Sequence, residues 1–145
     1  MLRAVVGGKP MSRQLVLCED DVEYMLKQAV DHYTASQTVQ AERLLRGILA
    51  VDPEEWRAWQ LLGSVLALEG YTVAASAMYK QCLKIKPDDM YALAALAEMS
   101  LAALRTADAG AYVERLVALD PDGRHPAANR VRRILAESIA RMQDS

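Results

Sequence analysis

From residue 22 onward, apolar residues recur at the three- and four-residue spacing of amphipathic helices. Turn signals such as Ser36-Gln37 and Gly70 separate the periodic stretches. Residues 1–19 carry no helical period, so we expect a flexible N-terminal segment there. The pattern predicts helices near Val22–Ala35, Thr38–Ala50, Pro53–Glu69, Thr72–Ile85, Asp89–Leu104, Ala107–Leu119 and Pro126–Met142.

Local signals support several of these boundaries. Asp20, with Glu23 three residues later, has the form of a capping box at the start of the first helix. Asp52 precedes Pro53, and proline suits the first turn of a helix because it lacks an N–H group. The turn at Leu104-Arg105-Thr106 has no glycine, so we expect its conformation to differ from the turn at Gly70.

The pattern repeats every 34 residues. Val51-Asp52-Pro53, Ile85-Lys86-Pro87 and Leu119-Asp120-Pro121 are spaced by that interval (53 to 87, 87 to 121). Five apolar or small columns in register over three units identify a helical repeat protein, in which small residues stand where paired helices approach closely. The columns are Met25, Trp59, Leu93; Ala29, Gly63, Ala97; Ala41, Ala75, Ala109; Leu45, Tyr79, Val113; and Ile48, Cys82, Leu116.

The middle unit carries the residues that define a known repeat. It reads Trp59-x-x-Leu62-Gly63-x-x-Leu66, then Ala75-x-x-x-Tyr79 and Pro87, which resembles the tetratricopeptide pattern. The resemblance covers about residues 22–123 and implies an all-α, right-handed solenoid of three helix-turn-helix repeats (about 22–55, 56–89 and 90–123) within a domain spanning 20–145. The register breaks after residue 123, and we expect a capping helix, at about 126–142, to solvate the open end of the stack.

The composition of this 145-residue chain narrows the choice of partners. Apolar residues make up 52% of it, enough for a continuous core. A net charge of −2 gives no electrostatic basis for binding nucleic acid or an anionic membrane surface, and no apolar run approaches the roughly 18 residues of a membrane span. Two cysteines in unrelated contexts do not form a disulfide framework, so we expect the reducing cytoplasm as the location.

No pattern of catalytic or metal-binding residues is recognisable. His32 and His125 lack partners at metal-ligand spacing. Cys82 falls in a core column, where a small buried side chain is expected. The acidic pair Asp88-Asp89 stands at a predicted helix start, where capping and the helix dipole explain it. We therefore expect a protein that is not an enzyme and that holds no cofactor or metal.

Stacked helix pairs curve, and the first helix of each pair lines the concave side. The resemblance implies that the second, fifth, ninth and twelfth positions of each unit face this groove, counted from Val22, Trp56 and Met90. The thirteenth positions, Thr34, Leu68 and Ala102, face it as well. The candidate peptide-binding residues are Glu23, Leu26, Val30, Tyr33, Arg57, Gln60, Ser64, Ala67, Tyr91, Ala94, Glu98 and Leu101.

These side chains predict a client that presents apolar anchors. Leu26 and Val30 occupy the places where tetratricopeptide co-chaperones clamp a carboxylate with Lys and Asn, and neither can bind one. Tyrosines in the groove supply large contact area at low entropic cost. Arg57 and Glu98 bracket the groove with opposite charges. For any single residue, covering a neighbouring helix is as good an interpretation as direct contact with a client.

The first repeat is also similar to that of the class II chaperones of bacterial type III secretion. The stretch from Tyr24 to Tyr33, followed by Ala41-Glu42 at the start of the second helix, carries this resemblance. It implies a cytoplasmic chaperone that grips an extended segment of a hydrophobic translocator, often as a homodimer formed through its N-terminal region. The apolar patch Leu15-Val16-Leu17-Cys18 either docks on the first repeat or makes a dimer contact.

Two functions follow from these patterns. The first is a non-catalytic module that binds an extended or helical client segment in the concave groove, as in a secretion chaperone. The second is a structural adaptor that joins a larger assembly through its convex face or its ends. Four arginines of the last helix could suggest a nucleic-acid patch, but without interleaved aromatic residues we interpret them as a solvated face: Arg130, Arg132, Arg133 and Arg141.

Overall fold

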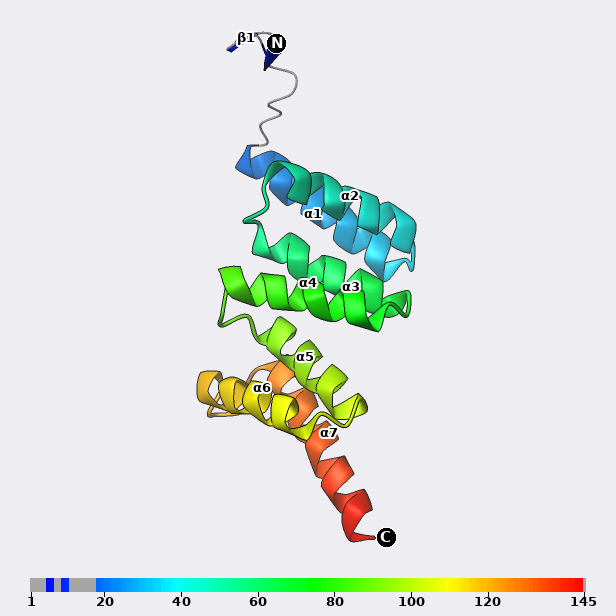
Figure 1. Ribbon diagram of the computed structural model, residues 1–145, viewed down its shortest axis with the longest axis vertical. Coiled ribbons are helices and arrows are strands. Elements are labelled where there is room, and N and C mark those ends of the chain that lie inside the picture. The colour runs from blue at the N-terminus through cyan, green and yellow to red at the C-terminus, as the bar shows by residue number, and fades with distance from the viewer. Residues whose placement is uncertain (1–4, 7–8, 11–17, 145) are drawn as a thin grey trace.

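A computed structural model describes residues 5–6, 9–10 and 18–144. In this part of the chain, three antiparallel helix pairs are stacked in a row and a last helix follows them (Figure 1). Near the N-terminus, strands β1 (Val5–Val6) and β2 (Lys9–Pro10) pair antiparallel. Most of the predicted flexible segment lies outside the described residues, and so do three of the four residues of the apolar patch Leu15-Val16-Leu17-Cys18. The helices are α1 (Glu19–Thr34), α2 (Thr38–Val51), α3 (Trp56–Leu68), α4 (Thr72–Ile85), α5 (Met90–Ala102), α6 (Thr106–Leu119) and α7 (Pro126–Gln143).

The 34-residue period of the sequence is visible in the second helix of each pair. α2, α4 and α6 each have 14 residues, begin at a threonine, and occupy ranges offset by that period. Their equal length follows from the repeat, because equivalent apolar residues must meet equivalent neighbours in every pair.

The turn inside each pair contains one residue with left-handed backbone: Ser36, Gly70 or Leu104, with φ of 61°, 90° and 58°. The expectation that the third turn differs is therefore wrong, since Leu104 has positive φ like Gly70 and equivalent backbone hydrogen bonds close both turns. The hydrogen bond from the Arg105 N–H to the Ser100 carbonyl oxygen (2.8 Å) closes this turn on the end of α5. The helix end thus imposes a conformation that costs a non-glycine residue about 1–2 kcal/mol.

Two predicted helix starts are also wrong. The N-cap of α1 is Cys18 rather than Asp20, and the Cys18 N–H and thiol both donate to Asp21 Oδ2 (3.2 and 3.0 Å). α3 begins at Trp56 rather than Pro53, because the residues before it form the turn that follows α2. The Cys18 side chain thus decides where α1 begins, and the turn after α2 decides where α3 begins.

The core runs along the row, where α1, α3 and α5 pack against α2, α4 and α6. Trp59 departs from its predicted core column, since it is half-buried and its Nε1–H donates to the Pro53 carbonyl oxygen (2.7 Å). Tyr79 lies directly over Gly63, where an added Cβ would meet the tyrosine ring at 2.9 Å. Buried members of the aligned columns are Ala29, Ala41, Leu45, Ile48, Gly63, Ala75, Tyr79, Cys82, Leu93, Ala97, Ala109 and Leu116.

Two glycine-to-alanine substitutions are expected to change stability in opposite directions. Gly63→Ala should destabilise the fold by about 1–3 kcal/mol, because the buried Tyr79 ring must move to admit the new methyl group. Gly110, inside α6, has no neighbour within 4 Å of its Cβ position, so Gly110→Ala should stabilise the fold by about 0.5–1 kcal/mol. Urea denaturation of both variants measures the two effects. Equal shifts of the two midpoints would contradict the close approach of α3 and α4.

Candidate functional site

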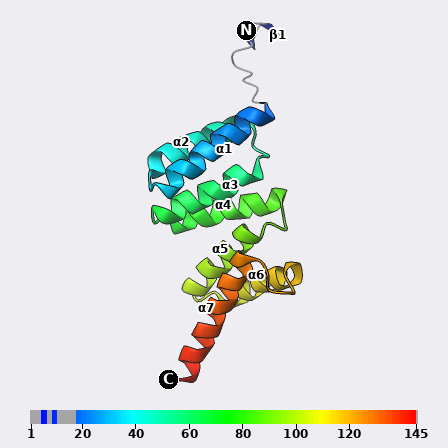
Figure 2. The same ribbon diagram turned by 180° about the vertical axis from the view of Figure 1, so that it is seen from behind.

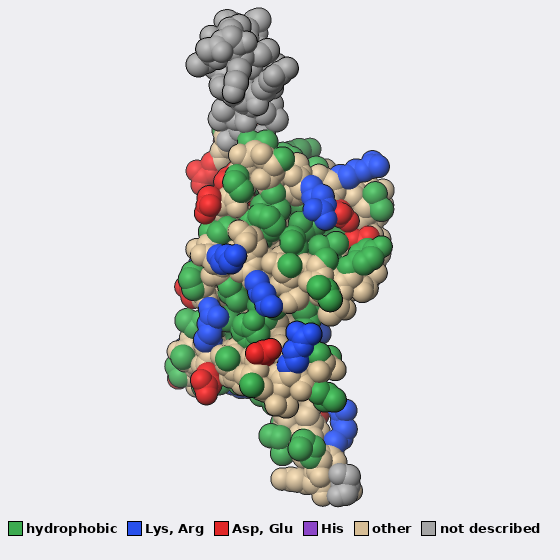
Figure 3. All heavy atoms as spheres, in the orientation of Figure 1, with side chains coloured by type: hydrophobic (Ala, Val, Ile, Leu, Met, Phe, Trp, Pro, Cys, Tyr) green, Lys and Arg blue, Asp and Glu red, His purple; other side chains and the backbone are tan. Residues whose placement is uncertain are grey.

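α1, α3 and α5 line one side of the row, which we call the inner surface (Figure 2). α2, α4 and α6 form the opposite, outer surface, where hydrophobic side chains are interspersed with Lys and Arg (Figure 3). Two cavities open on the inner surface, and Tyr91 lines both of them.

The first cavity, which we call the apolar cavity, has a volume of about 440 Å³. It lies between α1 and α3 and reaches the start of α5. Its apolar walls come from α1 and α3, and charged side chains stand at its margin. The lining residues are Glu23, Leu26, Lys27, Val30, Trp56, Arg57, Gln60, Leu61, Asp89 and Tyr91.

The second cavity, which we call the tyrosine cavity, has a volume of about 490 Å³. Three tyrosines and one ion pair line it, and the Tyr79 hydroxyl lies 2.9 Å from the hydroxyl of Ser64. Tyr79 belongs to the core, and only its polar end reaches the inner surface. The lining residues are Tyr33, Ser64, Ala67, Leu68, Tyr79, Tyr91, Ala95, Glu98, Met99 and Arg130.

The structure brings most of the predicted groove residues together. Of the twelve candidates, all except Ala94 and Leu101 line one of the two cavities. The candidates in the apolar cavity are Glu23, Leu26, Val30, Arg57, Gln60 and Tyr91, and those in the tyrosine cavity are Tyr33, Ser64, Ala67, Tyr91 and Glu98. Their role in binding a client stays a prediction.

Three of the predicted positions offer less surface than expected. Ala94 is 4% exposed, and Leu101 is half-buried outside both cavities. Leu26 lines the apolar cavity but is 7% exposed, so it belongs to the wall rather than to a protruding contact. The burial of Ala94 follows from the packing of α5, which contacts α4, α6 and α7 and so has less open surface than α1.

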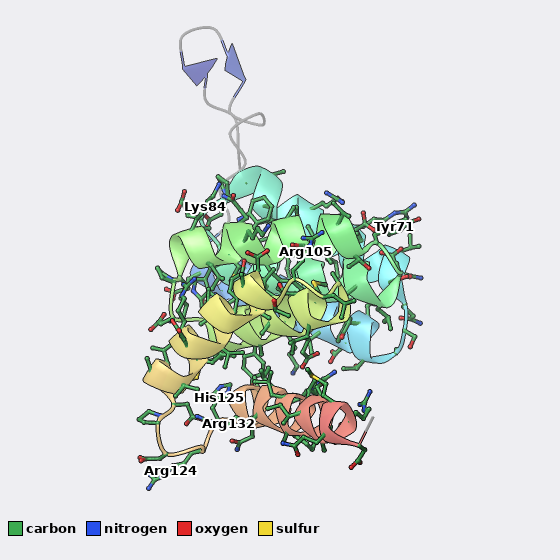
Figure 4. All side chains as sticks on the ribbon, turned by 60° about the horizontal axis from the view of Figure 1, so that its bottom comes forward. Tyr71, Lys84, Arg105, Arg124, His125 and Arg132 are labelled. Carbon is green, nitrogen blue, oxygen red and sulfur yellow. The ribbon has the colours of Figure 1, made fainter. Side chains whose placement is uncertain are left out.

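The position of α7 differs from that of the predicted end cap. α7 packs mainly against the inner helix α5 and touches α6 little. In Figure 4, α4 and α6 lie on one side of α5 and α7 lies on the other. The buried contacts are small, from Ala127, Ala128 and Val131. α7 therefore covers part of the inner surface at the third repeat instead of solvating the end of the stack.

A buried carboxylate holds the start of α7 in this place. Asp120, 7% exposed, accepts hydrogen bonds from the N–H groups of Arg124 (2.9 Å) and His125 (3.1 Å). Arg132 donates to both the Asp120 carboxylate (2.9 Å) and its carbonyl oxygen. Burial would raise the pKa of Asp120, but these hydrogen bonds, above all that from Arg132, outweigh it and lower the pKa. Arg132, which lies on α7, thus fixes the loop between α6 and α7.

The arginine of the apolar cavity is engaged by partners within the chain. Arg57 donates to Glu55 (2.6 Å) and to Glu23, which lies one repeat earlier on α1. The hydrogen bond to Glu55 is the main reason that the pKa of Arg57 is raised, while burial opposes it. Arg57 therefore ties the first repeat to the second and does not present the free positive charge that the sequence suggested.

Asp89 joins three helices beside the apolar cavity. Its carboxylate caps α5 by accepting the Ala92 N–H (3.1 Å) and accepts a hydrogen bond from Gln60 on α3 (2.7 Å). The Cys82 thiol of α4 lies 3.5 Å from the same oxygen. Burial, and to a lesser degree Asp89, raises the pKa of Cys82 to about 12, so this thiol is not a nucleophile near neutral pH.

The third repeat supplies the remaining polar contacts of the site. Glu98 on α5 forms an ion pair with Arg130 on α7 (Nε to carboxylate oxygen, 2.8 Å), and the Tyr91 and His125 rings meet edge-on with their centroids 5.0 Å apart. Sequence reasoning missed Arg130 because the repeat pattern carries no signal for the direction in which α7 packs. It missed the cavity role of Asp89 because capping of α5 already accounted for that residue.

Three comparisons with known proteins bear on the fold. No protein-family model matches the chain. The cellulose synthase 2 operon protein C of Komagataeibacter xylinus is 32% identical over 99 residues, which make up 68% of this chain and 7% of that protein. The chain thus spans a small fraction of the length of this relative.

Solved structures match over much more of their length. The type III secretion translocator chaperone SycD of Yersinia enterocolitica superposes with a TM-score of 0.78 at 17% identity, covering 98% of both chains. PcrH, in complex with the chaperone-binding region of PopD, gives a TM-score of 0.75 at 20% identity, covering 87% of this chain and 96% of that one. The first tetratricopeptide domain of Spaghetti (RPAP3), bound to an HSP90 peptide, gives 0.72 at 14% identity, covering 86% and 99%.

This chain has the tetratricopeptide-repeat fold. The prediction of an all-α tetratricopeptide solenoid is confirmed, and the predicted likeness to translocator chaperones is present in the structure. At sequence identities of 14–20%, the likeness to these structures shows the fold of the chain and does not show its function. In the part of the chain that the structure describes, no helix is long and apolar enough to cross a membrane.

Glu98 should make the stability of the fold depend on pH. Burial raises the pKa of Glu98 above its ordinary value of 4.5, and Arg130 offsets part of the effect. The folded state therefore binds the proton more tightly than the unfolded chain. As the pH rises through the range just above 4.5, the wild type should lose stability relative to Glu98→Gln. Urea denaturation of both proteins from about pH 4 to about pH 7 measures this, and a constant difference contradicts it.

Proposed function

We propose that this protein binds a segment of a client protein along its inner surface and acts as a chaperone, without catalysing a reaction. The observation that carries the proposal is that two cavities, of about 440 and 490 Å³, meet at Tyr91 on the side of the row lined by first helices. Because they share Tyr91, the two cavities are adjacent and form an open trough lined from α1 to α5, which suits a polypeptide segment better than a small molecule.

The chemistry of the trough favours apolar anchors in the client. Large hydrophobic side chains remain exposed on it, with Val30 44%, Leu68 52% and Tyr91 54% exposed. Its arginine, Arg57, is engaged by two glutamates and so has little charge to offer a ligand. Burial of apolar surface would therefore provide most of the binding free energy, and the exposed tyrosine would contribute a large share.

The structural neighbours support a client of this kind. SycD has been solved in complex with a peptide of the translocator YopD, and PcrH with the chaperone-binding regions of PopD and PopB. We propose that this chain holds a hydrophobic secreted protein in the cytoplasm in a comparable way. A carboxylate clamp of the co-chaperone type does not fit, because Leu26 and Val30 line the place where such a clamp would stand.

Three tyrosine-to-alanine variants test the location of the binding site. Tyr33 and Tyr91 line the tyrosine cavity, whereas Tyr71 is 60% exposed at the turn between α3 and α4, outside both cavities (Figure 4). After the client has been purified from the source cells and identified, calorimetry gives its affinity for each variant. Tyr33→Ala and Tyr91→Ala should weaken binding by about tenfold or more, or about 1.4 kcal/mol, with nearly unchanged melting temperatures. Tyr71→Ala should bind the client like the wild type. Equal affinities for all three variants would contradict the assignment of the binding site to the inner surface.

A second candidate function, a structural adaptor within a larger assembly, is favoured by two observations. The relative from the cellulose synthase 2 operon is a much longer protein, matched here over 7% of its length. Val73 and Leu104, 85% and 84% exposed, present apolar surface near the turns of the second and third pairs. If Val73→Asp with Leu104→Asp disrupts complexes isolated from the source cells while Tyr91→Ala leaves them intact, the adaptor role is the correct one.

A further inference from the structure

The tyrosine cavity contains a charge that the proposed apolar client does not explain. Glu98 lies on α5 within the cavity, and its side chain is 25% exposed. Burial disfavours the ionised carboxylate, as the direction of its pKa shift indicates. A carboxylate in such a place gains more from a bound cation than an exposed one does, because less solvent screens the pair.

The cation that the chain itself provides is loosely placed. Arg130 comes from α7, its side chain is 64% exposed, and its Nε forms an ion pair with a Glu98 carboxylate oxygen 2.8 Å away. Arg132 on the same helix shows the contrast, since it is 31% exposed and bound to the buried Asp120 through two hydrogen bonds. Arg132 anchors α7, whereas Arg130 reaches over the rim of the cavity. Moving Arg130 into solvent would leave the anchor of α7 in place.

The remaining lining also suits a cation. Tyr33 and Tyr91 line the cavity together with Glu98, and the face of a tyrosine ring carries negative partial charge that attracts ammonium and guanidinium groups. Ser64 and the Tyr79 hydroxyl add oxygen atoms that can accept hydrogen bonds. An acid surrounded by tyrosines is a site for Lys or Arg rather than for a further apolar anchor.

We propose that the tyrosine cavity receives a basic side chain of the client on Glu98, and that Arg130 occupies this place until the client displaces it. This inference rests on the proposed function. The client segment would then combine an apolar side chain, bound in the apolar cavity, with a Lys or Arg bound beyond Tyr91. Arg130 acts as an internal competitor, so a client with a suitable basic residue is favoured over one that is merely apolar.

The opposite assignment, in which Arg130 captures an acidic client residue, fits the geometry less well. Glu98 is the more buried member of the pair and belongs to the cavity wall, while Arg130 is largely exposed on a neighbouring helix. An acidic client residue placed in the cavity would lie close to the carboxylate of Glu98, which would repel it.

The probe is a peptide selected from a random dodecapeptide phage library for binding to the 145-residue chain. Peptides selected on the wild type, and lost on Tyr91→Ala, should be enriched in Lys or Arg beside apolar residues. The tightest of them is then synthesised with its basic residue intact and with that residue replaced by Gln. The replacement should weaken binding to the wild type about tenfold, as expected for loss of a charge-assisted hydrogen bond.

Three variants of the protein separate the roles of the charges. Arg130→Gln should tighten binding of the basic peptide several-fold and leave the Gln peptide unchanged, because the competitor is gone. Glu98→Gln should abolish the difference between the two peptides. Arg133→Gln, an exposed arginine of α7 outside both cavities, is the matched control and should behave as the wild type. Melting curves of each variant check that the fold is retained.

The outcomes distinguish this inference from the function on which it rests. If the selected peptides depend on Tyr91 but carry no excess of Lys or Arg, or if they carry Asp or Glu and lose affinity with Arg130→Gln, the inference is wrong and the proposed groove stands. If no selected peptide depends on Tyr91, the proposed function fails, and this inference fails with it.

Discussion

The structure depends on the close approach of the two helices within each pair. Gly63 has a tyrosine ring where a side chain would otherwise stand, and the equivalent places in the other pairs hold Ala29 and Ala97. Small residues at these points let the helices approach closely, and large buried side chains such as Leu45 and Leu62 fill the rest of the core. Because equivalent residues recur in each pair, every pair presents the same packing surface to the next one, and the pairs stack in a row. The shared turn geometry shows the strength of this constraint, since Leu104 is held in a left-handed conformation where Gly70 is free of strain.

A second constraint decides which part of the row remains open. Asp120 organises the loop after α6 through Arg124, His125 and Arg132, and this loop directs α7 onto α5. The inner surface of the first two repeats stays accessible, whereas that of the third is partly covered. The trough therefore ends at a wall made by the chain itself, and the ion pair between Glu98 and Arg130 lies on that wall.

The polar residues of the inner surface connect the repeats to one another. Arg57 links α1 to the start of α3, and Asp89 links α3, α4 and α5. Such contacts satisfy groups that would otherwise be costly to bury, and they keep the cavities in shape before a ligand arrives. A surface arranged in this way is preorganised for apolar contacts. The ion pair of the tyrosine cavity is less rigidly held than the charges around Arg57 and Asp120, since Arg130 is 64% exposed.

The sequence by itself determined the repeat, the number of helix pairs, the core columns and most of the residues on the inner surface. It could do so because these features depend on residues three, four or 34 positions apart, and that spacing is visible in the chain. The starts of α1 and α3 were misjudged because a cysteine thiol and a turn replaced the expected caps.

Only the tertiary structure decided where α7 lies and that Ala94 is covered. It also decided the ion pairs of the inner surface, in which Arg57 binds Glu23 and Glu98 binds Arg130. These outcomes depend on contacts between side chains of different repeats and of the last helix. Such contacts follow no period, because each arises once in the fold, and they exist only when the chain has already packed.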